Sequence, residues 1–302
     1  MQIISTDKEY TYDVFMDDFF RLMGEYNILE SGTAGYSVLG KRIPFIRFGR
    51  GCRKILITGA HHGKEWITAM LNMALIEALC RMYGEGKRFG ETDMIEFFNT
   101  RSIYFIPMVN PDGANLCIRG LTEDIPTFTQ SRLIGMNAGS REFVGLWQSN
   151  IRGVDLNHNY DALFEKGRAM EFAAGVYGPG KGRYSGEYPE SEPETQAVVG
   201  LTKEINPDIV IAYHSQGEEI YYNFNGKCAR GAVNIAQTLA RATGYKLIEA
   251  DGLTDCSGYK DWVIEHFNIP AYTIEVGKGE NPLPLSQFDK IYSDNLKAVL
   301  CL

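Results

Sequence analysis

Residues 54–66 read KILITGAHHGKEW, and this stretch decides the fold class. Its first five residues form a short apolar run, which is typical of a strand buried on both faces. Gly, two His and a Glu follow directly after that strand, and residues 66–83 then predict a long helix. A buried strand that leads through a polar turn into a helix is the repeating unit of an α/β protein.

The same pattern recurs along the chain. Three further apolar runs predict buried strands at residues 103–109, 209–213 and 271–276. Helices are predicted at residues 13–26, 192–205, 232–243, 259–267 and 286–300. Ser191 is the candidate N-cap of the second of these helices. Strands that alternate with helices predict a mixed or mostly parallel sheet that is covered on both faces.

Two segments depart from this alternation. Residues 36–39 and 43–48 predict a hairpin whose turn lies at Gly40 and Lys41. Residues 116–153 are Gly-rich and only weakly periodic, so they predict a long loop. A loop of that length in a compact protein is usually functional, and we expect it to form one wall of a cleft.

Composition and charge exclude several classes of protein. The chain has 302 residues, 44% hydrophobic and 23% charged, and a formal net charge of −8. A nucleic-acid partner is not expected, because a phosphate-binding face needs clustered Lys and Arg. The six cysteines form no CxxC pair, which favours reduced thiols over a disulfide framework or a cysteine zinc site. Neither a signal peptide nor a membrane-spanning run is recognisable, so we expect a cytoplasmic protein without membrane contact.

Polar groups cluster where the predicted strands end. His62 and Glu65 follow the first buried strand, His214 follows the third, and Glu275 lies inside the otherwise apolar fourth. Two His and one Glu, with a fourth position left to water, form the ligand set of a catalytic zinc site. Glu275 is then the candidate general base. Asp155 is a candidate partner for the second imidazole nitrogen of His62.

Each of these signals is weak by itself. A His and a Glu three residues apart occur by chance in many chains, and a lone His after a strand is usually structural. An acid within an apolar strand is more informative, because an unpaired buried carboxylate is costly. The hypothesis gains weight because every one of these groups lies at a predicted strand end or turn, where ligands gather in α/β sheets.

The ordered set HHGKEW, NPDG, GVDLNHNYD, YHSQ, GYKDW and TIEVG resembles the zinc metallocarboxypeptidase family of pancreatic type. The resemblance implies one α/β catalytic domain over residues 1–302, with residues 1–50 as an N-terminal helix and hairpin packed on it. It implies a three-layer sandwich with a mixed, mostly parallel eight-stranded sheet. It also implies one Zn²⁺ per chain held by His62, Glu65 and His214, with Glu275 as base and Asp155 as partner of His62.

The chain departs from the family where substrate carboxylates and carbonyls are held. Asn157 matches the family pattern, but His158 stands where the exopeptidases carry the Arg that grips the terminal carboxylate. Gln148 aligns by spacing with the Arg that polarises the scissile carbonyl, and Arg152 lies nearby in sequence. We expect these four residues to bind substrate.

Further departures concern the side-chain subsite. The mobile Tyr of the family falls on Leu253, and Tyr259 is close in sequence without being the matching position. We expect Tyr259 to contact the substrate as well. Lys260 aligns with the residue that sets side-chain specificity. A lysine there favours a substrate that carries a carboxylate.

The segments YPESEPET, AYHSQGEEIYY and TIEVGKGENPLPLSQF resemble a bacterial branch of the family, the γ-D-glutamyl-diaminopimelate endopeptidases. This resemblance implies a peptidoglycan stem peptide or muropeptide as substrate, cut between D-glutamate and a diamino acid. The alternatives are a carboxypeptidase that acts on ordinary peptides, an N-deacylase of the aspartoacylase type, and a zinc-free peptide-binding protein. The sequence does not indicate an oligomeric state.

Overall fold

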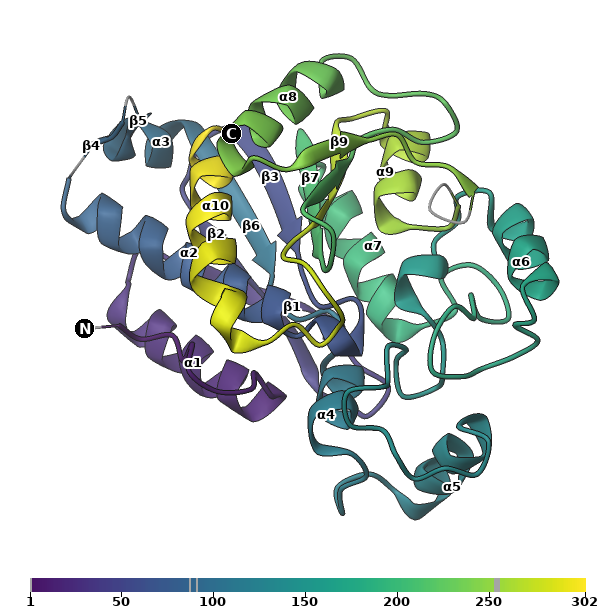
Figure 1. Ribbon diagram of the computed structural model, residues 1–302. Coiled ribbons are helices and arrows are strands. Elements are labelled where there is room, and N and C mark those ends of the chain that lie inside the picture. Colours follow the sequence, from purple (N-terminus) through teal and green to yellow (C-terminus); the bar gives the residue numbers. More distant parts are fainter. Residues whose placement is uncertain (1, 87, 91, 253–255) are drawn as a thin grey trace.

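The computed structural model describes the whole chain except residues 1, 87, 91 and 253–255. Its centre is an eight-stranded sheet in the order β1-β2-β6-β3-β7-β10-β8-β9 (Figure 1). The strands are β1 (Glu30–Tyr36), β2 (Arg42–Phe48), β3 (Arg53–Thr58), β6 (Arg101–Ile106), β7 (Ile209–His214), β8 (Glu219–Tyr221), β9 (Lys246–Ile248) and β10 (Ala271–Glu275). The pairs β6-β3, β3-β7, β7-β10 and β8-β9 are parallel, and the other three are antiparallel.

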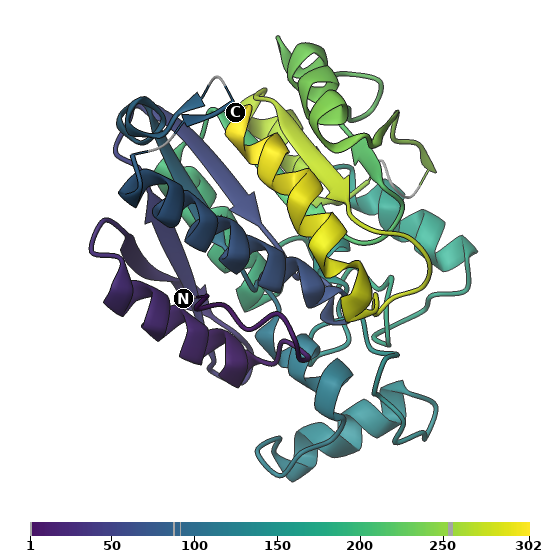
Figure 2. The same cartoon turned by 60° about the vertical axis from the view of Figure 1, so that its left-hand side comes forward.

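Helices cover both faces of this sheet because its central strands are apolar on both sides. Ile55 and Ile57 of β3 belong to one buried cluster, and Leu56 between them belongs to another. The first cluster includes residues of α1 (Tyr12–Glu25), α2 (Ile67–Gly84), α8 (Ala232–Thr243) and α10 (Phe288–Leu300). The second includes residues of α7 (Pro193–Ile205) and α9 (Tyr259–Phe267). Figure 2 shows α1, α2 and α10 side by side. The predicted three-layer fold is therefore confirmed.

The remaining α-helices and strands are short. They are α3 (Met94–Thr100), α4 (Pro111–Arg119), α5 (Thr127–Met136), α6 (Phe164–Ala173) and a small hairpin of β4 (Arg88–Phe89) and β5 (Thr92–Asp93). Both cartoon views place α5 away from the sheet (Figures 1 and 2). Among the described residues, none of the helices combines the length and apolar character that a membrane span requires.

Three local predictions are wrong. Strand β1 lies at Glu30–Tyr36, and residues 37–39 belong to the turn instead. The β1 sequence ESGTAGY shows no apolar alternation, and none of its residues is buried. The predicted loop at residues 116–153 contains α5, in which only Leu133 is buried, so no apolar stripe marks it. Glu192, not Ser191, is the N-cap residue of α7, and the Ser191 hydroxyl donates to its carboxylate instead.

Candidate active site

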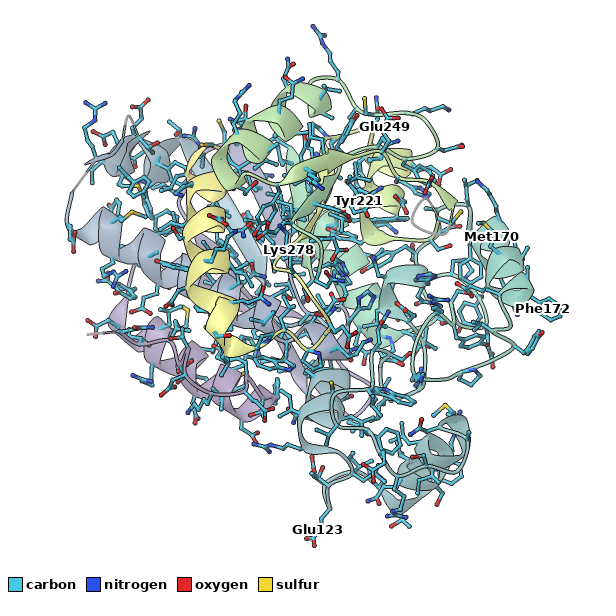
Figure 3. The ribbon with its side chains drawn as sticks, viewed as in Figure 1. Glu123, Met170, Phe172, Tyr221, Glu249 and Lys278 are labelled. Atoms are coloured by element: carbon cyan, nitrogen blue, oxygen red, sulfur yellow. The ribbon has the colours of Figure 1, made fainter. Side chains whose placement is uncertain are left out.

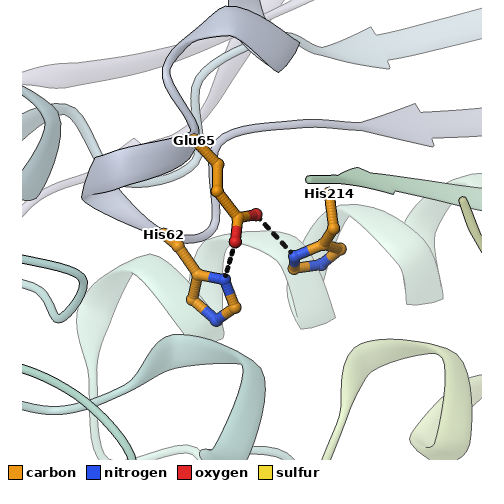
Figure 4. Close-up of side chains that lie close together, drawn as sticks. All are labelled: His62, Glu65 and His214. Carbon is orange, nitrogen blue, oxygen red and sulfur yellow. Dashed lines mark hydrogen bonds and ion pairs between the residues drawn. The ribbon is translucent and has the colours of Figure 1, made fainter. Parts of the chain in front are cut away.

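Three ionisable side chains meet at the carboxyl ends of β3 and β7 (Figure 4). His62 directly precedes a one-turn 3-10 helix, Gly63–Glu65, which follows β3. His214 is the last residue of β7. The Glu65 carboxylate lies between the two imidazoles. Its Oε1 is 2.8 Å from His62 Nδ1, and its Oε2 is 2.9 Å from His214 Nδ1.

This triad has the donor chemistry of a zinc site. One ligand atom from each of the three residues lies within 4.8 Å of the other two, and all three side chains are buried. Two imidazole nitrogens and a carboxylate suit Zn²⁺, and they leave a fourth position open to water. The residues present therefore fit the metal that the sequence implies.

The charges of the triad are strongly coupled. Burial opposes ionisation of Glu65, but His62 and His214 outweigh it and lower its pKa to about 2. Burial likewise opposes a charge on His62, but Glu65 and Asp155 outweigh it and raise the His62 pKa well above its usual value. A preformed carboxylate is thus available to a cation at this position.

Asp155 holds the triad from behind. Its Oδ1 is 3.0 Å from His62 Nε2, so the imidazole is gripped on both nitrogens. Its Oδ2 accepts from Gln148 Nε2 at 2.8 Å and from the backbone N–H of Arg183 at 2.9 Å. The Asn157 N–H also donates to Oδ1, at 3.2 Å. Such a partner fixes the orientation of a ligating imidazole.

Glu275 ends β10, directly beside His214 in the parallel register with β7. Burial and the neighbouring Glu65 carboxylate raise its pKa well above the usual value. A carboxyl group with a raised pKa is suited to accept and return a proton. Glu275 also lines the cavity that opens beside the triad.

That cavity has a volume of about 380 Å³. Of the predicted site residues, it is lined by His62, Gln148, Asn157, His158, Lys260 and Glu275. Ion pairs hold two of these. Lys260 Nζ pairs with Asp261 and donates to the Asn223 carbonyl, and His158 Nδ1 is 2.8 Å from Glu171 Oε1 on α6.

Two predicted substrate contacts do not line the cavity. Arg152 forms an ion pair with the buried Glu192 carboxylate instead, with 3.5 Å between Arg152 Nη1 and Glu192 Oε2. Tyr259 is fully buried, and its hydroxyl shares a hydrogen bond of 2.7 Å with Thr202 of α7. Its backbone N–H donates to Asn157 Oδ1, so it supports the site without facing substrate. Leu253, the position of the family's mobile Tyr, lies outside the described residues.

Six residues that line the cavity were not predicted as site residues: Arg183, Tyr221, Cys256, Gly258, Asp261 and Thr273. Tyr221, labelled in Figure 3, comes from β8, and its hydroxyl donates to Glu219 at 3.0 Å. Strand β8 has only three residues, too few for a periodic signal. Arg183 follows the Gly-rich stretch GPGKG in the segment between α6 and α7, where neither a motif nor a period marks it.

Comparison with known proteins agrees with this geometry. The family described as zinc carboxypeptidase matches residues 19–298. The chain belongs to this family. It is 34% identical to γ-D-glutamyl-L-diamino acid endopeptidase 1 of Lysinibacillus sphaericus, over 98% of this chain and 72% of that protein. It is 25% identical to carboxypeptidase B of Bos taurus, over 90% of this chain and 64% of that one.

Solved structures show the same fold. Thrombin-activatable fibrinolysis inhibitor superposes with a TM-score of 0.75 at 18% identity, over all of this chain and 76% of that one. A murein-tripeptide amidase from Escherichia coli O157 gives 0.55 at 20% identity, over 90% of this chain and 92% of that one. The chain is therefore a zinc-dependent metallopeptidase, which confirms the predicted enzyme class and cofactor.

Proposed function

We propose that this peptidase hydrolyses the bond between the γ-carboxyl of D-glutamate and a diamino acid in peptidoglycan stem peptides or muropeptides. The observation that carries the proposal is the character of the cavity beside the triad. Arg183, Lys260, Asp261 and His158 line it, where an apolar side-chain pocket would need hydrophobic walls. The 34% identical relative is named for such an activity, which supports the same substrate class.

The proposed mechanism assigns a task to each group. When bound, zinc supplies an activated water and polarises the scissile carbonyl. Glu275 accepts the proton that the attacking water loses and passes it to the departing amine. Asp155 keeps His62 in its ligating orientation. The Gln148 amide donates to Asp155, so it buttresses the site and brings no positive charge to the carbonyl.

The diamino acid explains why the cavity is charged. Diaminopimelate carries an ammonium and a carboxylate at the far end of its side chain, and such a zwitterion needs polar partners of both signs. The lining of the cavity carries both signs: Arg183 and Lys260 are basic, and Asp261 and Glu275 are acidic. The alternative is a carboxypeptidase that removes C-terminal residues, and similarity to carboxypeptidase B favours it. Against it, His158 stands where that activity needs a fixed bidentate cation.

One assay separates these candidates. The zinc-loaded protein is incubated with L-Ala-γ-D-Glu-diaminopimelate, with its α-linked isomer, and with a set of ordinary C-terminal peptides, and products are identified by mass spectrometry. We expect L-Ala-D-Glu and free diaminopimelate from the γ-linked peptide alone. Release of C-terminal residues from ordinary peptides, with the γ-linked bond intact, would replace the proposal by a carboxypeptidase.

A further inference from the structure

Hydrogen bonds fix the backbone around Arg183 at the cavity. The Gln148 N–H donates to the Lys181 carbonyl at 2.9 Å, and the Asp155 N–H donates to the Tyr184 carbonyl at 2.8 Å. Between these two bonds, the Arg183 N–H donates to Asp155 Oδ2 at 2.9 Å. The residue carrying the guanidinium is thus anchored to the same carboxylate that orients His62.

The segment also lies close against the wall of the cavity. A methyl group added at Gly182 would lie 3.5 Å from Gln148 Cβ. Arg183 itself has a φ of +68°, in the left-handed region that side chains other than Gly seldom adopt. Unusual backbone that is fixed by surrounding hydrogen bonds is common at ligand sites. The location of Arg183 on the cavity is therefore built into the fold.

The charges around Arg183 are already matched. Lys260 is paired with Asp261, and His158 with Glu171. In the part of the chain that the structure describes, the Arg183 guanidinium makes no ion pair or side-chain hydrogen bond, although it lines the cavity. A guanidinium offers a rigid fork that matches a carboxylate. Among the described residues that line the cavity, Arg183 thus provides a permanently charged group that is available to a ligand.

We infer that Arg183 binds a carboxylate of the diamino acid on the amine side of the scissile bond and so sets specificity for it. This inference rests on the proposed function. Asn157 and His158 line the same cavity, and they occupy the positions where the family holds the residue beyond the scissile bond. His158 lacks the fixed cation of that position, and Arg183 supplies one from a different segment of the chain. Two carboxylates could be its ligand, the α-carboxylate or the one at the end of the side chain.

Three commercially available amines separate these two sources. Diaminopimelate carries both carboxylates, lysine only the α-carboxylate, and cadaverine neither. Binding of each to the zinc-loaded protein is measured by calorimetry for the wild type, Arg183→Gln and Arg183→Lys, with the exposed Arg132→Gln as charge-matched control. Each step from diaminopimelate to lysine to cadaverine removes one carboxylate. For the wild type, we expect the affinity to fall about 10- to 100-fold at the step that removes the carboxylate bound by Arg183.

The variants then decide the inference. This fall in affinity should be absent in Arg183→Gln, partly retained in Arg183→Lys and fully retained in Arg132→Gln. The inference is overturned if Arg183→Gln still shows the wild-type fall in affinity along the series. It is also overturned if Arg183→Gln weakens the binding of all three amines equally, or if the wild type binds all three with the same affinity. These measurements report binding and not cleavage. A protein that does not cleave the γ-linked peptide would contradict the proposed function, and that result is distinguishable from each of the binding outcomes above.

Discussion

His62 Nε2 lies 3.0 Å from Asp155 Oδ1, so the imidazole that faces the metal site is held from behind by a buried carboxylate. Asp155→Asn should therefore weaken zinc binding. The amide that replaces Oδ2 would face two donors, Gln148 Nε2 and the Arg183 N–H. We expect a loss of about 10- to 100-fold in zinc affinity, measured by competition with a chelator.

The control for this variant lies on the same segment. Asp161 is exposed, and Asp161→Asn removes the same charge without touching His62. Its zinc affinity should stay within about twofold of wild type, on the scale of ordinary surface changes. Equal affinities of the Asp155 and Asp161 variants would show that Asp155 does not orient the ligand.

Glu275→Gln separates proton transfer from metal binding. Glutamine keeps the shape of the side chain but cannot take up the proton. We expect the zinc content to remain at the wild-type level while turnover falls by at least about 100-fold. Metal content by mass spectrometry and kcat on the γ-linked peptide are the two measurements. Exposed Glu265 on α9 provides the matched Glu265→Gln control.

Two results would reject this role. Loss of zinc together with activity would make Glu275 part of the metal site rather than a base. Turnover like that of the wild type would exclude it from proton transfer altogether.

Lys260 was expected from its position to select the substrate, but the structure pairs it with buried Asp261. Lys260→Met leaves that carboxylate without its cation. We expect the free energy of unfolding to fall by about 3–5 kcal/mol, the usual cost of breaking a buried pair. The double variant Lys260→Met/Asp261→Asn should recover part of this loss in denaturant unfolding. A single variant as stable as wild type would show that the pair contributes little.

The central strands could be predicted because each buries both faces. The runs at residues 54–58, 209–213 and 271–276 match β3, β7 and β10 within one residue at each end. The run at residues 103–109 finds β6 but begins two residues and ends three residues too late. The edge strands β1 and β9 and the neighbouring strand β8 could not, because β1 is polar and β8 and β9 have three residues each. Packing and pairing with neighbours, rather than their own pattern, make these segments strands.

The site divides in the same way. His62, Glu65, His214 and Glu275 follow or end buried strands, so the strand pattern places them together. Arg183 reaches the cavity through hydrogen bonds with residues about 30 positions earlier in the chain, and no local pattern encodes such contacts. Lys260 shows the converse: its position was predicted, but its partner Asp261 decides what its charge does.

Glu194 at the start of α7 gives the stability of the protein a pH dependence. Burial raises its pKa to about 7 from 4.5, even though the Val38 N–H and the Asn150 amide donate to its carboxylate. The folded state therefore holds this proton more tightly than the unfolded state. The resulting stabilisation is fully present below about pH 4.5 and is lost as the pH rises to about 7, a change on the order of 3 kcal/mol.

Glu194→Gln should remove this contribution because glutamine does not titrate. The free energy of unfolding, measured in urea at pH 5 and pH 8, should fall less between these values in the variant than in the wild type. The difference between the two falls should be on the order of 2–3 kcal/mol, whatever the variant's stability at either pH. Glu204→Gln, on the exposed side of the same helix, should leave the wild-type fall unchanged. If Glu194→Gln and Glu204→Gln behave alike, the buried carboxyl is not the source of the pH dependence.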